Sequence, residues 1–164
     1  MEQKQVVVAF SGGLDTSFTV MYLAKEKGYE VYAACANTGG FSPEQLKQNE
    51  ENAYKLGAKE YVTLDVTQEY YEKSLRYMIY GNVLRNGTYP ISVSSERIFQ
   101  ALAIARYANE IGADAIAHGS TGATPPRPAS PPASNMHYRA IPVLSREFLH
   151  HRLMYPRYLR YKNI

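Results

Sequence analysis

Apolar residues occur along this chain in two patterns, short continuous runs and longer stretches with helical spacing. The continuous run at residues 5–10 predicts a buried strand, and residues 30–37, 60–66 and 114–119 are predicted to form three further strands. The stretches between them predict helices over residues 15–27, 43–56, 67–84 and 96–111. This order of strands and helices predicts an α/β fold with a doubly wound, mostly parallel, Rossmann-like sheet.

Residues at the ends of these segments support the assignment. Ser42 is expected to cap a helix, with Pro43 in its first turn. Gly28 and Gly57 are each expected to end a helix. Residues 85–95 are expected to form a loop before the last helix.

Polar clusters follow three of the predicted strands, at residues 11–17, 37–41 and 118–122. Right-handed crossovers place the carboxyl ends of parallel strands along one edge of the sheet. Ligands of open α/β sheets bind at that edge, where the strand order reverses. The sequence therefore predicts a ligand site there.

The first cluster, Ser-Gly-Gly-Leu-Asp-Thr-Ser at residues 11–17, has the residue types of a phosphate site. Glycines allow close backbone approach, N–H groups at a helix N-terminus attract an anion, and hydroxyls add neutral donors. Asp15 would repel phosphate unless a cation lies between them, which points to Mg²⁺. An ordinary turn would explain the glycines but not the polar residues after them. The phosphate-binding patterns G-x-G-x-x-G and G-x-x-x-x-G-K-[ST] do not occur in this loop.

Charge and composition divide the chain near Ala123. The first 123 residues carry 11 Lys and Arg against 14 Asp and Glu, whereas the last 41 carry seven against one. All 11 glycines precede residue 124, and seven of the nine prolines follow it. We expect an α/β domain over residues 1–123 and an irregular, Pro- and Arg-rich tail over residues 124–164. Partial helical spacing favours a helix over residues 143–161, interrupted at Pro156.

The single cysteine, Cys35, lies in a predicted strand, where a buried apolar role is expected. No apolar run approaches the roughly 20 residues that cross a bilayer, and the N-terminus has no signal-peptide pattern. These features predict a cytoplasmic setting without a membrane partner.

Four motifs occur in one order: "AFSGGLDTS", "ANTGGF", "GTYPISVSSERIFQ" and "AHGSTGA". The string "SGGLDTS" resembles the pyrophosphate-binding loop of the ATP pyrophosphatase superfamily. Together the four motifs resemble the N-terminal nucleotide-binding domain of the argininosuccinate synthase family, over residues 5–123. The resemblance implies a ligase of arginine biosynthesis that uses ATP and Mg²⁺ to join citrulline to aspartate. The reaction would pass through citrullyl-AMP and release pyrophosphate and AMP. Full-length members of the family are expected to be homo-oligomers.

The resemblance also assigns site residues. The implied ATP contacts are Ala9, Phe10, Ser11, Gly12, Gly13, Leu14, Asp15, Thr16, Ser17, Ala36 and Gly119. Asp15 is in addition the candidate Mg²⁺ ligand. The implied citrulline contacts are Tyr89 and Ser94, and Thr121 is the implied aspartate contact. No residue is assigned general-base chemistry, because adenylation makes the ureido oxygen a leaving group and catalysis then rests on positioning.

Three residues of the assigned motifs have an ordinary structural alternative. Tyr89 precedes Pro90 and could be a turn residue. Arg97 corresponds to an arginine of the same motif, a possible substrate contact, and could equally form a surface ion pair. His118 is expected to be structural rather than catalytic.

The resemblance stops at Ala123. The family continues with a glycine, then with an Asn-Asp-Gln sequence whose Asn and Asp hold aspartate and citrulline, and with a long second domain. Neither is found here, so we expect ATP binding without turnover. A frameshifted end or a genuine basic tail would each explain the change of composition.

Two alternative functions stay open at this point. One is an ATP-binding module without catalysis, and the other is an RNA-modifying ATP pyrophosphatase that uses the basic tail. The motif over residues 89–99 favours the argininosuccinate synthase family, and a nucleic acid partner is therefore not expected.

Overall fold

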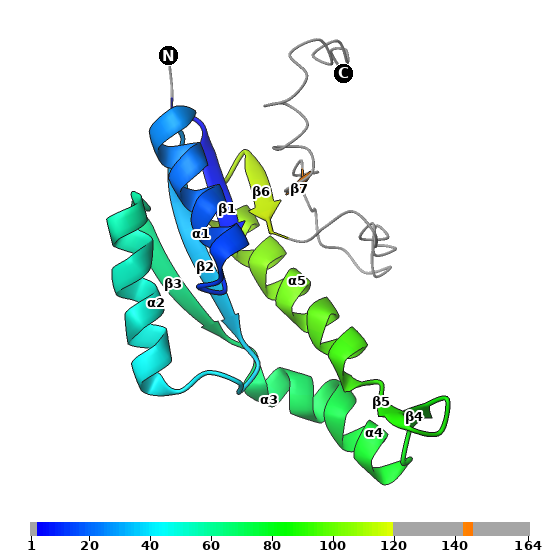
Figure 1. Ribbon diagram of the computed structural model, residues 1–164. Coiled ribbons are helices and arrows are strands. Elements are labelled where there is room, and N and C mark those ends of the chain that lie inside the picture. The colour runs from blue at the N-terminus through cyan, green and yellow to red at the C-terminus, as the bar shows by residue number, and fades with distance from the viewer. Residues whose placement is uncertain (1–2, 120–142, 146–164) are drawn as a thin grey trace.

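The sheet of this protein has five strands in the order β3-β2-β1-β6-β7, and every neighbouring pair is parallel (Figure 1). A computed structural model describes residues 3–119 and 143–145. The strands are β1 (Gln5–Ala9), β2 (Glu30–Asn37), β3 (Glu60–Asp65), β6 (Ala115–His118) and β7 (Val143–Ser145). The strand order reverses between β1 and β6. The predicted α/β fold with a parallel sheet is confirmed.

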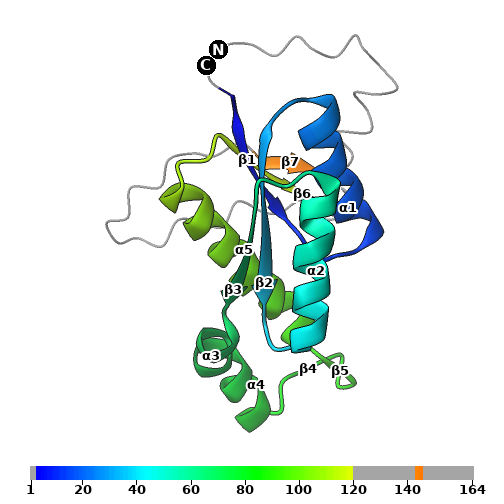
Figure 2. The same cartoon turned by 90° about the vertical axis from the view of Figure 1, so that its left-hand side faces the viewer.

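Helices cover both faces of the sheet (Figures 1 and 2). One face carries α1 (Leu14–Met21), its π-helical continuation η1 (Tyr22–Glu26) and α2 (Pro43–Leu56), and the other carries α5 (Ser92–Glu110). Val6 and Val8 of β1 belong to the core under α1 and α2, whereas Val7 belongs to the core under α5. A strand covered on both faces must be apolar at successive positions, which explains the continuous run in the sequence.

Both ends of α2 are fixed by the residues that the sequence indicated. The Gln45 N–H donates to the Ser42 hydroxyl (3.3 Å), and the Ser42 N–H donates to the Gln45 side-chain oxygen (2.9 Å). This reciprocal pair is a capping box, which satisfies two backbone donors. Gly57 ends the helix in the left-handed conformation, with φ +107°. The caps confirm the predicted boundaries of this helix.

Residues 67–91 extend beyond the carboxyl edge of the sheet, and we call this segment the arm (Figures 1 and 2). The arm contains α3 (Thr67–Tyr70), the π-helical turn η2 (Tyr71–Leu75), α4 (Arg76–Tyr80) and the short antiparallel strands β4 (Leu84–Arg85) and β5 (Tyr89–Pro90). Its exposed large apolar side chains are Tyr71, Tyr77, Ile79, Tyr80, Val83, Leu84 and Ile91. From the arm, α5 leads the chain back to the sheet.

Two expectations about the arm are corrected by the structure. The helix expected over residues 67–84 ends at Tyr80, because Gly81 is its C-cap and Asn82 follows with φ +45°. The loop expected over residues 85–95 contains β5 and the first turn of α5, which begins at Ser92. The Ser95 hydroxyl donates to the Ser92 carbonyl (2.9 Å), a local bond that stabilises this early turn.

Residues 143–145 were expected to begin a helix, and this expectation is wrong. They form β7, parallel to β6, with Val143 opposite Ile116. Partial helical spacing does not distinguish a helix from a short strand, whereas the free edge of β6 offers backbone partners. The chain between β6 and β7 exceeds the dozen or so residues that a parallel crossover needs. The rest of the expected tail, residues 124–142 and 146–164, lies outside the described residues.

No helix in the described part of the chain is both long enough and apolar enough to cross a membrane.

Candidate functional site

The first loop leaves β1 beside the reversal of strand order and runs directly into α1. The Phe10 N–H donates to the Ala34 carbonyl of β2 (2.9 Å), and the Phe10 ring is buried in the core, so a ligand would meet only its backbone. Gly12 has φ +77°, which side-chain-bearing residues rarely adopt. Gly13 is the N-cap of α1, and no side chain caps the first turn. The N–H groups of that turn therefore face a site where an anion would bind.

Hydroxyl groups brace this loop from inside. Thr16 is buried, and its hydroxyl donates to the Gly13 carbonyl (3.0 Å). The Ser11 hydroxyl oxygen lies 3.5 Å from that of Thr16, and Ser11 is otherwise exposed. The Thr16 hydrogen is used within the loop, whereas the Ser11 hydroxyl can be reached by a ligand. The Ser17 N–H donates to the Gly13 carbonyl (3.0 Å) as a normal helical bond. Leu14 is 85% exposed, so its part in a site would come from its backbone.

The end of β6 closes one side of the loop. His118 pairs with Ala9, and Gly119 follows it directly. A Cβ atom placed on Gly119 would lie 3.1 Å from both the Asp15 Cβ and the Thr16 Cγ2. Glycine at this position thus lets β6 approach the N-terminus of α1 closely. Burial lowers the pKa of His118, which favours the neutral imidazole at pH 7.

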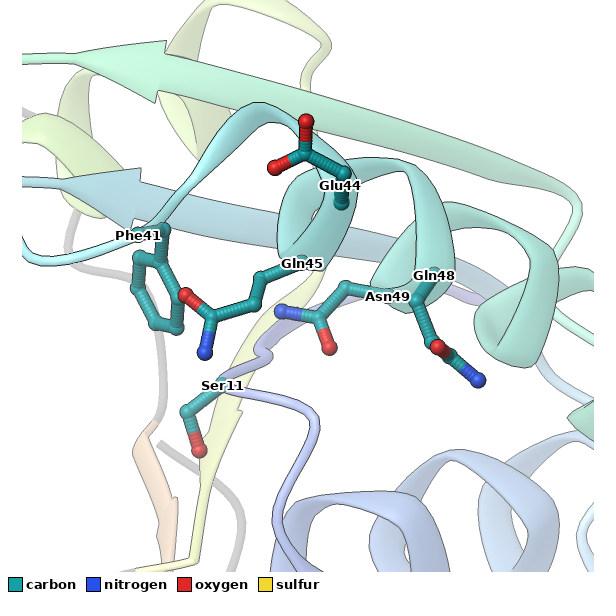
Figure 3. A pocket seen from close by; sticks show the side chains of 6 residues that line it. All are labelled: Ser11, Phe41, Glu44, Gln45, Gln48 and Asn49. Atoms are coloured by element: carbon teal, nitrogen blue, oxygen red, sulfur yellow. The ribbon is translucent and has the colours of Figure 1, made fainter.

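The opposite side of the loop opens into a pocket of about 260 Å³ (Figure 3). Ser11 lines the pocket from the first loop, and its other lining residues come from α2 and the turn before it: Phe41, Glu44, Gln45, Gln48 and Asn49. In Figure 3 the Asn49 carboxamide points into the space between Ser11 and Gln45, whereas Glu44 points away from it.

The sequence patterns did not identify the pocket residues that α2 contributes, and Asn49 is the buried one among them. A signal was present, because Asn49 and Ala53 are the two buried residues of α2 and stand four positions apart. A polar residue on the buried face of an amphipathic helix has to be explained by a partner or a ligand.

Comparison with known proteins matches the part of the chain that carries this site. A family model described as "Arginosuccinate synthase N-terminal HUP domain" matches residues 5–125. The chain belongs to the argininosuccinate synthase family. Argininosuccinate synthases of Xanthomonas campestris, Hyperthermus butylicus and Methanocaldococcus jannaschii are 40%, 39% and 37% identical to it over 122, 117 and 120 residues. These alignments cover 74%, 71% and 73% of this chain but only 30%, 29% and 30% of the relatives, so the chain spans less than a third of their length.

The residues that the family resemblance links to amino-acid substrates lie on other elements than the first loop. Tyr89 belongs to β5 of the arm, which Figures 1 and 2 show beyond the carboxyl edge of the sheet. Ser94 and Arg97 are exposed at the start of α5, and Arg97 forms no salt bridge within the described part of the chain. Thr121 lies outside the described residues. The surface ion pair considered for Arg97 is therefore not observed.

A hydrogen bond joins the start of α5 to the sheet edge. Thr38, in the turn after β2, donates to the Glu96 carboxylate (2.5 Å), and the Gln100 amide donates to the same oxygen (3.1 Å). Ala36, the position expected beside adenine, is partly buried near the end of β2, opposite Leu64 of β3. The turn after β2 and the start of α5 are thus held together at the edge that carries the first loop.

One acidic side chain near the first loop could take part in holding a metal ion, namely Asp15. In residues 3–119 and 143–145, no group of three His, Cys, Asp or Glu side chains could hold a metal ion. Asp15, in the first turn of α1, is the only acid of that turn. Mg²⁺ commonly takes one or two carboxylates and completes its shell with phosphate oxygens and water.

Cys35 is buried within β2, as expected for an apolar filler, and burial raises the pKa of its thiol.

Proposed function

We propose that this chain binds ATP at the first loop and is the nucleotide-binding part of an argininosuccinate synthase-type ligase. One observation carries the proposal: the N-terminus of α1 has no side-chain cap and lies between the glycines of the first loop and Gly119. Uncapped N–H groups at a helix N-terminus, approached through glycines, suit a phosphate chain. Membership of the argininosuccinate synthase family favours ATP as the source of that phosphate chain.

The proposed reaction joins citrulline to aspartate in two steps. The ureido oxygen of citrulline attacks the α-phosphorus of ATP, which expels pyrophosphate and forms citrullyl-AMP. The aspartate amine then attacks the ureido carbon, and the C–O bond to AMP breaks. In this chain the backbone of the first loop and the Ser11 hydroxyl would hold the phosphates. Mg²⁺, when bound beside Asp15, would neutralise part of the phosphate charge.

The residues proposed to bind citrulline and aspartate lie partly in this chain and partly in the region that only the longer family members have. Tyr89, Ser94 and Arg97 would contribute to the citrulline side, and Thr121 to the aspartate side. The chain spans about 30% of its curated relatives, and orienting two reactants can supply roughly 7–11 kcal/mol of a barrier. We therefore propose that the chain alone binds ATP but forms no argininosuccinate, as a nucleotide-binding module would. We expect a cytoplasmic setting, and nothing in the fold or the family match favours an RNA-modifying role.

Calorimetry and a product assay test this proposal together. Titration of the full chain with ATP and Mg²⁺ should give one saturable site. Incubation with ATP, Mg²⁺, citrulline and labelled aspartate should give no labelled argininosuccinate above the control without protein. Failure to bind ATP would refute the nucleotide site. Formation of product would refute the prediction about turnover and would assign the missing groups to residues 120–164.

Substitution at Asp15 tests the metal assignment. Asp15→Asn should weaken Mg·ATP binding more than it weakens the binding of ATP in EDTA, because only the first complex needs a carboxylate next to the phosphates. The unaltered chain, titrated under both conditions, is the reference. The opposite order of effects would remove Asp15 from the metal site.

A further inference from the structure

Asn49 is a buried polar side chain that the proposed function does not yet use. It lies on the inner side of α2 and is 9% exposed. Within the residues that the structure describes, its carboxamide forms no hydrogen bond and no other polar interaction. An amide on the buried face of a helix that has no protein partner has to be satisfied by water or by a ligand. A native protein that keeps such a group usually provides it with water or a ligand.

The pocket beside the first loop is where that partner would bind. No described side chain has a fully enclosed nitrogen or oxygen without a hydrogen bond. The polar atoms of Asn49 are therefore reached from the pocket of about 260 Å³ that it lines together with Ser11. Figure 3 shows the Nδ2 atom of Asn49 directed into this space, on the same side as the Gln45 carboxamide. The space holds more than one water molecule, because a water needs a share of about 30 Å³.

Contact between Asn49 and Gly12 ties this side chain to the phosphate loop. A Cβ atom placed on Gly12 would lie 2.1 Å from the Asn49 Oδ1 and 2.8 Å from its Cγ. The carboxamide thus occupies the space that any side chain at position 12 would fill. With Oδ1 packed against the loop backbone, Nδ2 is the atom left to donate to a ligand. Ser11 and Asn49 therefore place two neutral donors at one opening, from two different elements.

We infer that Asn49 is a phosphate-binding residue: its Nδ2–H donates to an oxygen of the phosphate chain that the first loop holds. This inference rests on the proposed ATP site and adds α2 to it as a third element, after α1 and the end of β6. A phosphate is favoured over the nucleoside because the amide adjoins Gly12 rather than the Ala36 side of the edge. Glu44, the one acid of the pocket, points away from the donors.

Binding of three probes by the full chain and three variants tests the inference. The probes are ATP, inorganic pyrophosphate and adenosine, each titrated by calorimetry. Asn49→Ala removes the donor, and Asn49→Asp keeps the shape but replaces the donor with a carboxylate. Asn52→Ala, which removes an amide of the same helix outside the pocket, is the matched control. Thermal unfolding of each variant reports whether it is folded.

We expect Asn49→Ala to weaken ATP and pyrophosphate binding about tenfold to a hundredfold, the effect of losing one hydrogen bond to a charged group. Asn49→Asp should weaken both further, and Asn52→Ala should leave both unchanged. Adenosine binding should not depend on residue 49. Equal binding of pyrophosphate by the unaltered chain and the folded Asn49→Asp variant would overturn the inference while leaving the ATP site intact. A loss confined to adenosine would overturn the phosphate assignment, and absence of any binding by the unaltered chain would overturn both proposals.

Discussion

Apolar side chains are buried in β1, at the centre of the sheet, but are exposed to solvent in the arm. In β1, Val7 and Val8 are 0% exposed, and they belong to the two cores on opposite faces of the sheet, Val8 under α1 and α2 and Val7 under α5. In the arm, residues of the same apolar character are open to solvent, among them Ile79 at 63% exposed. Burial of apolar surface is the main favourable term in folding. The sheet with α1, α2 and α5 is therefore the part of the molecule that apolar burial stabilises.

The arm depends on a few contacts with α5. The Tyr70 hydroxyl donates to the Ser92 carbonyl (3.0 Å), and the Tyr70 ring lies against Phe99 with a centroid distance of 5.3 Å. Arg106 pairs with Glu69 (2.9 Å). The proposed site divides along the same line, with the phosphate loop on the sheet and the citrulline positions on the arm and the start of α5. ATP binding should therefore tolerate changes in the arm, whereas citrulline binding should not.

The largest difference between the two regions should appear in stability. Leu23→Ala removes a side chain that is 1% exposed in the core under α1, and it should lower the free energy of unfolding by about 2–5 kcal/mol. Ile79→Ala, in the arm, should change it by about 0.5 kcal/mol or less, because the side chain already lies in solvent. Chemical denaturation of both variants measures the contrast. Similar losses would mean that the arm is buried in the protein as it exists in solution.

The second contrast concerns ATP affinity. Ser11→Ala removes a reachable hydroxyl from the phosphate loop and should cost about 1.5–3 kcal/mol of ATP binding, the range for a hydrogen bond to a charged group. Gly13→Ala should also weaken binding, since a methyl group would obstruct the backbone approach. Ser94→Ala, an identical change at the start of α5, is the matched control and should leave ATP affinity unaltered. Equal affinities for all four proteins would show that the first loop is not the ATP site.

The sequence was sufficient to predict the sheet because β1 and β2 contain continuous apolar runs and β3 and β6 are short apolar segments bounded by turn residues. The four predicted strands are found within one residue of their expected ends, and the caps of α2 follow from Ser42 and Gly57. These features depend on local chemistry, namely burial on both faces and the conformations that capping residues allow.

Features that depend on tertiary contacts were harder to predict. The early start of α5 and the β4–β5 pairing lie in a segment without clear periodicity. β7 forms because the edge of β6 is available, which no pattern over residues 143–145 indicates. Asn49 was missed for the same reason: its proximity to Gly12 results from how α2 packs beside the first loop. The residues of the first loop were identified from a local motif, and their ligand contacts stay predictions.

A smaller effect is expected from Tyr70→Phe, which should lower the local stability of the arm but not that of the sheet. Tyr70→Phe removes the hydrogen bond to the Ser92 carbonyl and should destabilise the arm by about 0.5–1.5 kcal/mol. The lower end applies, because the Ser95 hydroxyl also donates to that carbonyl. Hydrogen exchange should become faster for amides of residues 67–91 and stay unchanged for β1. Tyr71→Phe, at an exposed neighbour, should change neither region; faster exchange throughout the protein would instead mean that the arm and sheet unfold together.

The smallest expected effect on stability comes from the ion pair between Glu69 of α3 and Arg106 of α5. The Arg106 guanidinium, with help from Lys73, lowers the pKa of Glu69 to about 2. A glutamate in an unfolded chain titrates near about 4.3, so the folded state favours the charged form. The resulting stability is fully present above that value and is lost as the pH falls toward 2. Its size should be about 1 kcal/mol or less, since both cations are largely exposed.

Replacing Glu69 with an uncharged residue should therefore lower the stability of the protein at neutral pH but not in acid. At pH 7, Glu69→Gln should lower the unfolding temperature slightly, and the gap from the unaltered chain should close as the pH falls from about 5 to about 2. High salt should narrow the gap as well, because exposed ion pairs are screened. Glu72→Gln, at an exposed position that accepts a hydrogen bond from the Gln68 amide and has no hydrogen bond or ion pair with α5 among the described residues, is the matched control and should show a much weaker pH dependence. A gap that stays constant down to pH 2 would show that Glu69 acts through packing, so that the arm is fastened to α5 by its aromatic contact and the Tyr70 hydrogen bond instead of by charge.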